Sequence, residues 1–433
     1  MRAEISIEDL AATTDALRSG ELDLLEYLGR LERRFQEIEP TVQAFLPEEG
    51  RFERLRREAA ALRRRFARPA ERPALFGVPM GVKDIFRVDG FPTRAGSHLP
   101  PEALAGPEAE CVTRLKQSGA LVMGKTVSTE FAYFVPGPTR NPRALDHTPG
   151  GSSSGSAAAV AAGLCPLALG TQSIGSISRP ASFCGVVGYK PSYDRISTAG
   201  VIPLASSVDH VGLFTPEVAG IQKVARHLVV GWRQVSLESV PVVGVPVGPY
   251  LDRASEEARR HFDELCDRLT AAAFEVVRVP ALADFDTVVQ RHDLLLAGEA
   301  ATAHSKWFAE YSDLYDPRTA SLILEGQRIS PQKLEEARRG RERLRQELEA
   351  LMDEYGVDLW ASPAATGPAP LGLESTGDPA MNLPWTQAGL PTVALPSLSF
   401  TSGLPLGLQL AARWYRDEEL LAWGARIEER TNT

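Results

Sequence analysis

The sequence has few cysteines and no long hydrophobic run. Its four cysteines, Cys111, Cys165, Cys184 and Cys266, are unevenly spaced and form no CxxC pair. This spacing argues against a disulfide framework or a cysteine-ligated zinc site and favours a reducing, cytoplasmic location. No segment reaches the roughly 18 apolar residues of a membrane-spanning helix. Acidic residues also occupy the N-terminal stretch, where a secretory signal would be apolar. We therefore expect neither secretion nor a membrane span.

Positive charge is in the minority as well. The formal net charge is -9 at pH 7, whereas binding to nucleic acid or to an anionic membrane needs clustered positive charge. The arginine-rich stretch 51–72 interleaves glutamate with arginine, which is typical of a solvated helix face. The seven histidines show no metal-binding spacing such as HExxH. We expect no direct nucleic-acid partner, no metal and no other cofactor.

The chain is nevertheless large and apolar enough to bury a substantial core. It has 433 residues, of which 43% are hydrophobic and 24% are charged. Residues 1–70 have helical patterns, with Ser6 as a candidate N-cap, Gly20 as a stop and apolar residues at helical spacing over 22–38. This segment predicts a helical lead-in.

From residue 74 onward, short apolar runs alternate with helical patterns, which predicts an α/β fold. The apolar runs are 76–82, 120–124, 157–163, 166–170, 241–247, 357–363, 391–396 and 405–412. The helical patterns are 108–118, 254–273, 285–308, 331–355 and 417–429, and residues 203–237 are expected to be rich in loops. We predict one large domain over 1–433 with a central mixed sheet flanked by helices. Its parts are the lead-in, a catalytic core at 74–245, a largely helical insertion at 254–355 and a return to the sheet at 356–433.

Residues 148–178 contain no charged residue and are dense in glycine, serine and alanine. Glycine permits close approach, and small side chains leave backbone N–H groups free to face a ligand. A flexible Gly/Ser linker is the alternative, but the segment includes AAAVAAGL, which is apolar enough to be buried. The composition therefore indicates a buried site built from backbone.

Two short motifs typical of other enzymes also occur. GALVMGKT at 119–126 fits the phosphate-loop pattern, but its interior has the pattern of a strand, whereas a phosphate-binding loop should follow one. Residues 151–155 fit GxSxG around Ser153, but no histidine follows His304, so the late histidine of an α/β-hydrolase is missing. We expect neither chemistry. Cys184, in an apolar run without a nearby histidine, is expected to be an inert core residue.

The order and spacing of the longer motifs resemble the amidase signature family. The motifs are GVPMGVKDIF at 77–86, GKT at 124–126, TPGGSSSGSAAAVAAG at 148–163 and GTQSIGSISRPASFCGVVGYKPS at 170–192. Ser152 lies 69 residues after Lys83, and Ser176 lies 24 residues after Ser152. The likeness continues into 384–412 and so covers most of the chain.

The resemblance implies a Ser-Ser-Lys triad that hydrolyses a small-molecule carboxamide. Ser176 would attack the carbonyl to form an acyl-enzyme, Ser152 would relay the proton after a cis peptide bond from Gly151, and Lys83 would be the final base. Since a lysine has an ordinary pKa of about 10.4, its apolar surroundings must stabilise the neutral amine. An ion pair between Lys83 and its neighbour Asp84 is the alternative interpretation.

The resemblance also implies an oxyanion hole formed by four backbone N–H groups, those of Ser173, Ile174, Gly175 and Ser176. Many family members have glycine where this chain has Ile174, and others often have aspartate where it has Gln172. We therefore expect either a reshaped hole or reduced activity. Arg179 is expected to be a buried structural pairing rather than a substrate contact.

Two alternatives to a stand-alone amidase stay open. One is the glutamine-hydrolysing subunit of a tRNA-dependent amidotransferase, although MNLPWTQAGLP at 381–391 lacks the acidic residue expected near a glutamine α-amino group. The other is a catalytically weakened family member, supported by Ile174. A homodimer is compatible with the sequence. Substrate contacts stay unknown, although Phe131, Tyr133, Phe134 and Trp385 suggest an apolar or aromatic acyl group.

Overall fold

The computed structural model describes residues 8–237, 239–397 and 402–431. Ten strands form one mixed sheet in the order β2-β1-β3-β5-β4-β9-β10-β8-β6-β7. The strands are β1 (Pro79–Lys83), β2 (Leu121–Thr126), β3 (Leu167–Gln172), β4 (Val187–Lys190), β5 (His210–Thr215), β6 (Val242–Val247), β7 (Glu275–Pro280), β8 (Leu359–Pro363), β9 (Thr392–Leu395) and β10 (Leu408–Ala412). Parallel pairs at each end of the sheet enclose antiparallel strands in the middle. The predicted single α/β domain with a mixed sheet is confirmed.

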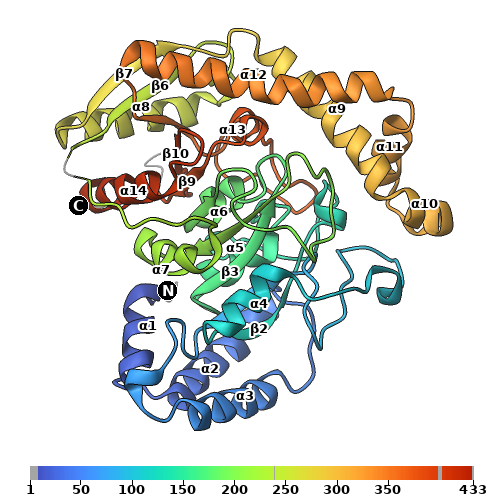
Figure 1. Cartoon of the computed structure of the whole chain (residues 1–433), viewed down its shortest axis with the longest axis vertical. Coiled ribbons are helices and arrows are strands. Elements are labelled where there is room, and N and C mark those ends of the chain that lie inside the picture. The colour runs from blue at the N-terminus through green and yellow to red at the C-terminus, as the bar shows by residue number, and fades with distance from the viewer. Residues whose placement is uncertain (1–7, 238, 398–401, 432–433) are drawn as a thin grey trace.

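Helices cover the sheet and extend beyond both of its ends (Figure 1). The α-helices of the described residues are α1 (Leu10–Ser19), α2 (Leu24–Val42), α3 (Arg51–Arg65), α4 (Glu110–Gln117), α5 (Ser154–Ala161), α6 (Ser178–Cys184), α7 (Val218–Leu228), α8 (Glu256–Ala271), α9 (Phe285–Ala303), α10 (Ser305–Tyr311), α11 (Pro317–Gly326), α12 (Pro331–Tyr355), α13 (Leu383–Ala388) and α14 (Asp417–Thr431). Short 3-10 helices are η1 (Pro69–Glu71), η2 (Pro101–Leu104), η3 (Glu130–Ala132), η4 (Leu251–Arg253) and η5 (Ser312–Leu314). Within the described ranges, no helix is both long and apolar enough to cross a membrane.

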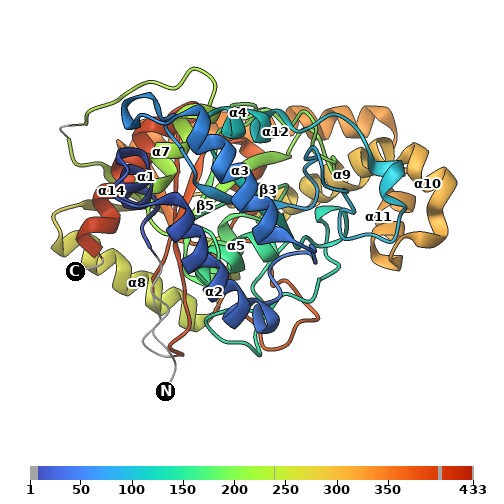
Figure 2. The same ribbon diagram turned by 90° about the horizontal axis from the view of Figure 1, so that it is seen from below.

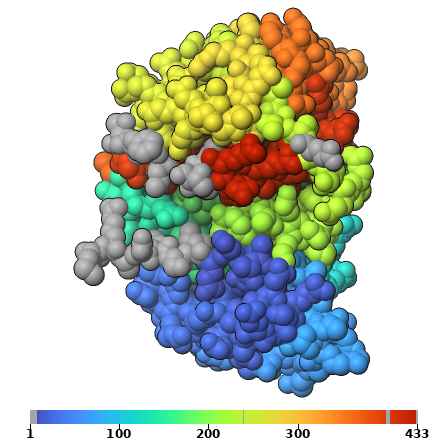
Figure 3. Space-filling model, turned by 90° about the vertical axis from the view of Figure 1, so that its left-hand side faces the viewer, coloured from blue at the N-terminus to red at the C-terminus, as the bar shows by residue number. Residues whose placement is uncertain are grey.

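The N-terminal helices and the helical insertion lie at opposite ends of the molecule. α2 and α3 cross one end, as the view from below shows (Figure 2), and α9 to α12 project from the other (Figure 1). On the face shown in Figure 3, the C-terminal residues lie between these two ends. The N-terminal segment is helical, as expected, and consists mainly of α1 to α3. The candidate N-cap Ser6 lies outside the described residues. The insertion is largely helical but also contributes β7, which pairs with β6 at the sheet edge.

Local sequence signals explain several boundaries. α1 ends at Gly20, whose φ of 85° is left-handed, and the Asp23 side chain caps α2 by accepting from two backbone N–H groups. α5 packs tightly because Gly155 lacks a side chain: a Cβ there would lie 2.2 Å from the carbonyl oxygen of Ala44. The apolar run 157–163 therefore belongs to a buried helix that begins directly after the loop carrying Ser152.

The expectation of a loop-rich stretch at 203–237 holds for residues 203–209 and 229–237 but misses two elements. This stretch contains the helix α7 and the strand β5. β5 pairs antiparallel with β3 on one side and with β4 on the other. All six residues of β5 are buried, so the strand has no alternation of polar and apolar residues that would reveal it. Gly212 also interrupts the apolar run of the strand. Glycine is required there because a Cβ would lie 2.3 Å from the carbonyl oxygen of Tyr189.

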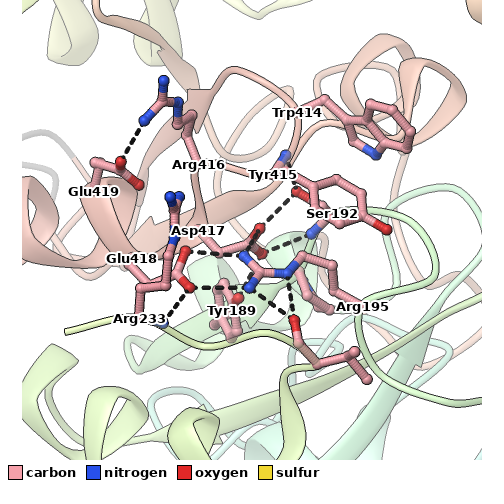
Figure 4. A network of polar contacts seen from close by, with 12 residues as sticks. Tyr189, Ser192, Arg195, Arg233, Trp414, Tyr415, Arg416, Asp417, Glu418 and Glu419 are labelled. Carbon is pink, nitrogen blue, oxygen red and sulfur yellow. Dashed lines mark hydrogen bonds and ion pairs between the residues drawn. The ribbon is translucent and has the colours of Figure 1, made fainter. Parts of the chain in front are cut away.

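A buried ion-pair network attaches the last helix to the middle of the chain (Figure 4). The guanidinium of Arg195 contacts the Asp417 and Glu418 carboxylates at 2.9 Å, and Asp417 also accepts from the hydroxyl of Tyr189 at 2.6 Å and from Ser192. Both acids lie in the first turn of α14, where the helix dipole favours negative charge. The network fixes α14 against the segment that follows β4.

Candidate active site

Lys83 ends β1 in a fully buried position. Its Nζ atom donates to the hydroxyl of Ser152 at 2.7 Å and to that of Thr171 at 2.8 Å. Burial lowers the pKa of Lys83 well below its ordinary value, while the Asp209 carboxylate acts in the opposite direction. The amine therefore has two neutral hydroxyl partners in a setting that favours its uncharged form.

The neighbouring Asp84 does not pair with Lys83. Its carboxylate lies 2.6 Å from Nζ of Lys125, and both side chains are buried. Lys125 belongs to the GKT motif, which the structure places within the buried strand β2. The motif is thus part of the sheet, as expected, and its lysine neutralises a buried acid.

The loop before α5 holds Ser152 next to Lys83. The Gly151–Ser152 peptide bond is cis, as the resemblance implied. Arg179 donates to the Gly151 carbonyl oxygen at 2.7 Å and to the Thr376 hydroxyl at 3.1 Å, so it is the buried structural residue that was expected. Burial lowers the pKa of Arg179 to about 10. The arginine therefore holds the loop at the carbonyl group of Gly151.

The serine and cysteine of the competing motifs have structural partners. The Ser153 hydroxyl donates to the Thr171 carbonyl oxygen at 3.1 Å and accepts from the Thr171 N–H at 3.2 Å, which ties the loop to β3. Cys184 is fully buried, its Sγ lies 3.4 Å from the Pro149 carbonyl oxygen, and burial raises its thiol pKa. Neither side chain is available as a nucleophile.

Ser176 lies in the turn between β3 and α6. β1 and β3 are adjacent parallel strands, so this turn leaves the sheet at the edge where Lys83 ends β1. Ser176 is 6% exposed, and in the described part of the chain its hydroxyl makes no hydrogen bond to another residue. Its oxygen is thus free to meet a substrate.

The carbonyl groups of this turn are all engaged. The oxygen of Gln172 lies 3.3 Å from His210 Nδ1, that of Ser173 lies 2.9 Å from His292 Nε2, and that of Ile174 accepts from Thr386 Oγ1 at 2.6 Å. The Gly175 oxygen accepts from the Arg179 N–H at 3.0 Å.

Engaged carbonyls orient the N–H groups that follow them. In a trans peptide the C=O and the next N–H point in opposite directions. The N–H group that follows each of these carbonyls therefore points away from the carbonyl's hydrogen-bond partner. These are the N–H groups of Ser173, Ile174, Gly175 and Ser176, and none of them has a hydrogen-bond acceptor among the described residues. This arrangement leaves backbone donors available to a developing negative charge.

The two departures from the family pattern have structural explanations. Gln172 accepts from the N–H groups of Ile177 and Ser178 at 2.7 and 3.0 Å, and its amide donates to the Thr386 hydroxyl at 2.8 Å. It can therefore both accept and donate, whereas an ionised aspartate only accepts. Ile174 does not adopt a positive φ, so its branched side chain causes no backbone strain of that kind.

Gly175 is the position in the turn that requires glycine. A Cβ there would lie 2.3 Å from Oδ1 of Asn382. Asn382 is held by its amide, which donates to the Ala364 carbonyl oxygen and to Gln409 Oε1, both at 2.9 Å. The Asn382 side chain could therefore move away only by breaking these hydrogen bonds.

Several contacts were not predicted from sequence. Thr171 is a buried polar residue inside an apolar strand, and this could have marked it as a partner of the site. Asp209 accepts from the Ser173 hydroxyl and from the N–H groups of Leu204 and Ala205, and burial raises its pKa. His292 gave no signal, because it contacts Ser173 across 119 residues of sequence.

The aromatic residues proposed for substrate binding divide into two groups. Phe131 stacks on Tyr315 at 5.0 Å, and Trp385 donates to the hydroxyl of Tyr250, so both belong to the core. Tyr133 and Phe134 remain half-buried. A cavity of about 40 Å³ also lies beside the site, lined by Thr171, Ser173, Asp209, His210 and largely apolar neighbours.

Comparisons with known proteins show the family of the chain. The Amidase family matches residues 26–421. The A subunit of glutamyl-tRNA(Gln) amidotransferase from Thermus thermophilus is 34% identical over 95% of each chain. AtzE of Pseudomonas sp. strain ADP, which is one subunit of 1-carboxybiuret hydrolase, is 33% identical over 87% of this chain and 89% of its own. A crystal structure of an amidase, 33% identical, has a TM-score of 0.87 and covers 98% of this chain and 100% of that one. The chain belongs to the amidase family of amide-hydrolysing enzymes.

Proposed function

We propose that this amidase cleaves a carboxamide to a carboxylate and ammonia or an amine, with Ser176 as nucleophile, Ser152 as proton relay and Lys83 as base. The observation that carries the proposal is the buried Lys83 amine, which lies 2.7 Å from the Ser152 hydroxyl and contacts no carboxylate among the described residues. Such an amine can be neutral at ordinary pH, and only the neutral amine has a lone pair to accept a proton.

The steps follow from these roles. Ser176 Oγ attacks the amide carbon while its proton passes to Ser152, whose own proton passes to Nζ of Lys83. The C–N bond then breaks as the relay returns a proton to the leaving nitrogen, which leaves an acyl ester on Ser176. Water attacks this ester by the same proton route, releasing the carboxylate and restoring the serine.

The proposal assigns the stabilisation of the negative charge on the tetrahedral oxygen to four backbone N–H groups, those of Ser173, Ile174, Gly175 and Ser176. This assignment is supported by the preceding carbonyl groups, each of which is held by a hydrogen bond and so orients the N–H group of its own peptide. Removing one such donor costs about 3 to 4 kcal/mol of transition-state stabilisation in a well-studied hydrolase. Because Ile174 has no positive φ, backbone strain does not support the alternative of a catalytically weakened family member, and stand-alone turnover is the test of that alternative.

A second candidate is a glutamine-hydrolysing subunit that works with a partner protein. It is favoured by the 34% identity to the A subunit of an amidotransferase, and the 1-carboxybiuret hydrolase relative is likewise one subunit of an enzyme. Under this hypothesis tRNA would be bound by the assembly rather than by this acidic chain. A homodimer is the alternative assembly. A cytoplasmic location suits both candidates, since all four cysteines are free and buried.

Ammonia release from benzamide, an aliphatic amide, glutamine and a peptide amide tests both candidates. We expect the wild type to hydrolyse at least one amide, and Ser176→Ala and Lys83→Ala to hydrolyse none. Ser178→Ala is the matched control, because the hydroxyl of this nearby buried serine only approaches that of Thr392, at 3.5 Å, and the variant should retain activity. Glutamine as the best substrate would favour the second candidate, and full activity of Ser176→Ala would reject the proposal.

A further inference from the structure

Among the described residues, His292 is the one side chain of the helical insertion that hydrogen-bonds to the turn at 172–176, which we call the nucleophile turn. His292 lies on α9 and is fully buried. Its Nε2 atom is 2.9 Å from the carbonyl oxygen of Ser173. The other carbonyl ties of the turn come from outside the insertion: His210 begins β5, Thr386 belongs to α13 and Arg179 belongs to α6.

A second contact fixes which nitrogen of His292 carries the proton. The Gln387 amide nitrogen lies 3.3 Å from Nδ1 of His292 and donates to the Val288 carbonyl oxygen at 2.8 Å. Gln387 is oriented in turn by Arg291, which donates to its Oε1 at 3.0 Å. Because Nδ1 faces an N–H donor, the proton is on Nε2, which donates to Ser173.

The charge state of the ring agrees with this hydrogen-bond pattern. Burial lowers the pKa of His292 to about 4. The ring is therefore neutral at ordinary pH, with one donor and one acceptor nitrogen.

The hydrogen bond from His292 to the Ser173 carbonyl oxygen constrains one peptide plane. The Ser173 side chain is separately anchored, since its hydroxyl donates to Asp209. With that end fixed, the bond from His292 to the carbonyl sets the rotation of the peptide between Ser173 and Ile174. The Ile174 N–H belongs to this peptide and points opposite to the carbonyl.

We infer that His292 is a positioning residue of the oxyanion hole: its bond to the Ser173 carbonyl aims the Ile174 N–H at the developing negative charge. The inference rests on the proposed function, because it assumes that Ser176 is the nucleophile. It makes the helical insertion part of the catalytic framework as well as a cover for the sheet. It also explains why a histidine and a glutamine are buried together beside this turn.

His304 provides a matched control. It is also fully buried at the end of α9, its Nε2 lies 3.1 Å from a backbone carbonyl oxygen, and its pKa is lowered to about 4. That carbonyl, however, belongs to Pro203 and not to the nucleophile turn. His304→Phe therefore removes a similar bond at a similar depth without touching the peptide that we assign to the hole.

The experiment measures the rate at which a fluorophosphonate probe labels Ser176, because the phosphonyl oxygen also occupies the oxyanion hole. We expect His292→Phe to label at least tenfold more slowly than wild type, and kcat on any hydrolysed amide to fall by a similar factor while KM changes less than threefold. His292→Gln, which keeps an N–H donor, should recover to within threefold. His304→Phe should label within twofold of wild type.

Thermal unfolding separates positioning from stability. Both phenylalanine variants should lose stability, since each leaves buried polar groups without partners. Equal labelling rates in wild type and His292→Phe, or an equal loss in His304→Phe, would overturn the inference and leave the proposed function intact. Absence of Ser176 labelling in the wild type would overturn the proposed function, and the inference with it.

Discussion

Asp84 directs its carboxylate to Lys125, 2.6 Å away, and not to Lys83, the residue that precedes it in the sequence. The two lysines therefore have different electrostatic settings at one edge of the sheet. Lys125 is charge-paired, whereas Lys83 has the hydroxyls of Ser152 and Thr171 as its partners. This division leaves Lys83 without a carboxylate partner, as the proposed role of a neutral base requires, although a buried acid lies beside it.

The ion pair should matter for stability more than for chemistry. Lys125→Met leaves the buried Asp84 carboxylate unpaired, and we expect a loss of about 3 to 5 kcal/mol in the free energy of unfolding. The double variant Asp84→Asn/Lys125→Met should recover most of it, because both charges are gone. Urea denaturation measures this, and equal losses in the single and double variants would contradict it.

The pH dependence should report the Lys83 amine. Since the base must be neutral, kcat/KM should rise with pH through the pKa of Lys83, which burial holds well below that of an ordinary lysine. The Asp209 carboxylate raises that pKa, so Asp209→Asn should lower it and move the acidic limb to lower pH. A pH profile of both proteins checks this; a shift to higher pH in the variant would be the wrong sign.

Gly175→Ala should disable the site through a single methyl group. The added Cβ would meet Asn382 Oδ1 at 2.3 Å, and Asn382 is held in place, so the turn must move. We expect kcat to fall by about 10² or more, in line with the loss of an oxyanion donor. Gly29→Ala is the control, since Gly29 lies in the middle of α2 and a Cβ there would meet only the Arg33 guanidinium, at 3.9 Å. This control should be active and about 0.5 to 1 kcal/mol more stable.

Glu428 should make stability fall as the pH rises. Burial raises its pKa from 4.5 to about 7 in the folded protein, with Glu217 and Asp9 adding repulsion. The protonated form is thus favoured by folding, and its contribution is full below about pH 4.5 and lost as the pH rises through about 7. Glu428→Gln keeps an acceptor for the Val218 N–H and should be about 1 to 2 kcal/mol more stable than wild type at pH 8, after allowing for partial exposure.

The same comparison at pH 5 is the internal control for Glu428. The carboxyl group is then largely protonated in the folded protein, so the two proteins should unfold at nearly the same urea concentration. A constant difference at both pH values would show that packing, rather than ionisation, distinguishes them.

Much of the fold could be predicted from periodicity. β1, β2 and β3 and the helices α8 and α12 fall where apolar runs and helical spacing placed them. β5 could not be placed, since a short strand buried on both faces shows no alternation, and a glycine interrupts it. α7, by contrast, is predictable in principle, because its buried residues Val218, Ile221 and Leu228 follow helical spacing.

The site likewise contains residues that could be predicted from the sequence and others that could not. The ordered motifs predict Lys83, Ser152 and Ser176 as the triad, and the structure shows a hydrogen bond between the first two. The supports of the turn could not be foreseen, because Thr386 and His292 meet it from segments more than a hundred residues away. Such contacts depend on the tertiary arrangement and have no local pattern.

The most direct test of the account is the mass of the enzyme during turnover of an activated anilide, quenched in acid within the first cycle. We predict a mass increase equal to the acyl group, located on the peptide that contains Ser176 and absent from Ser176→Ala. An acyl group on another residue, or turnover that persists in Ser176→Ala, would contradict the assignment of Ser176 as the nucleophile.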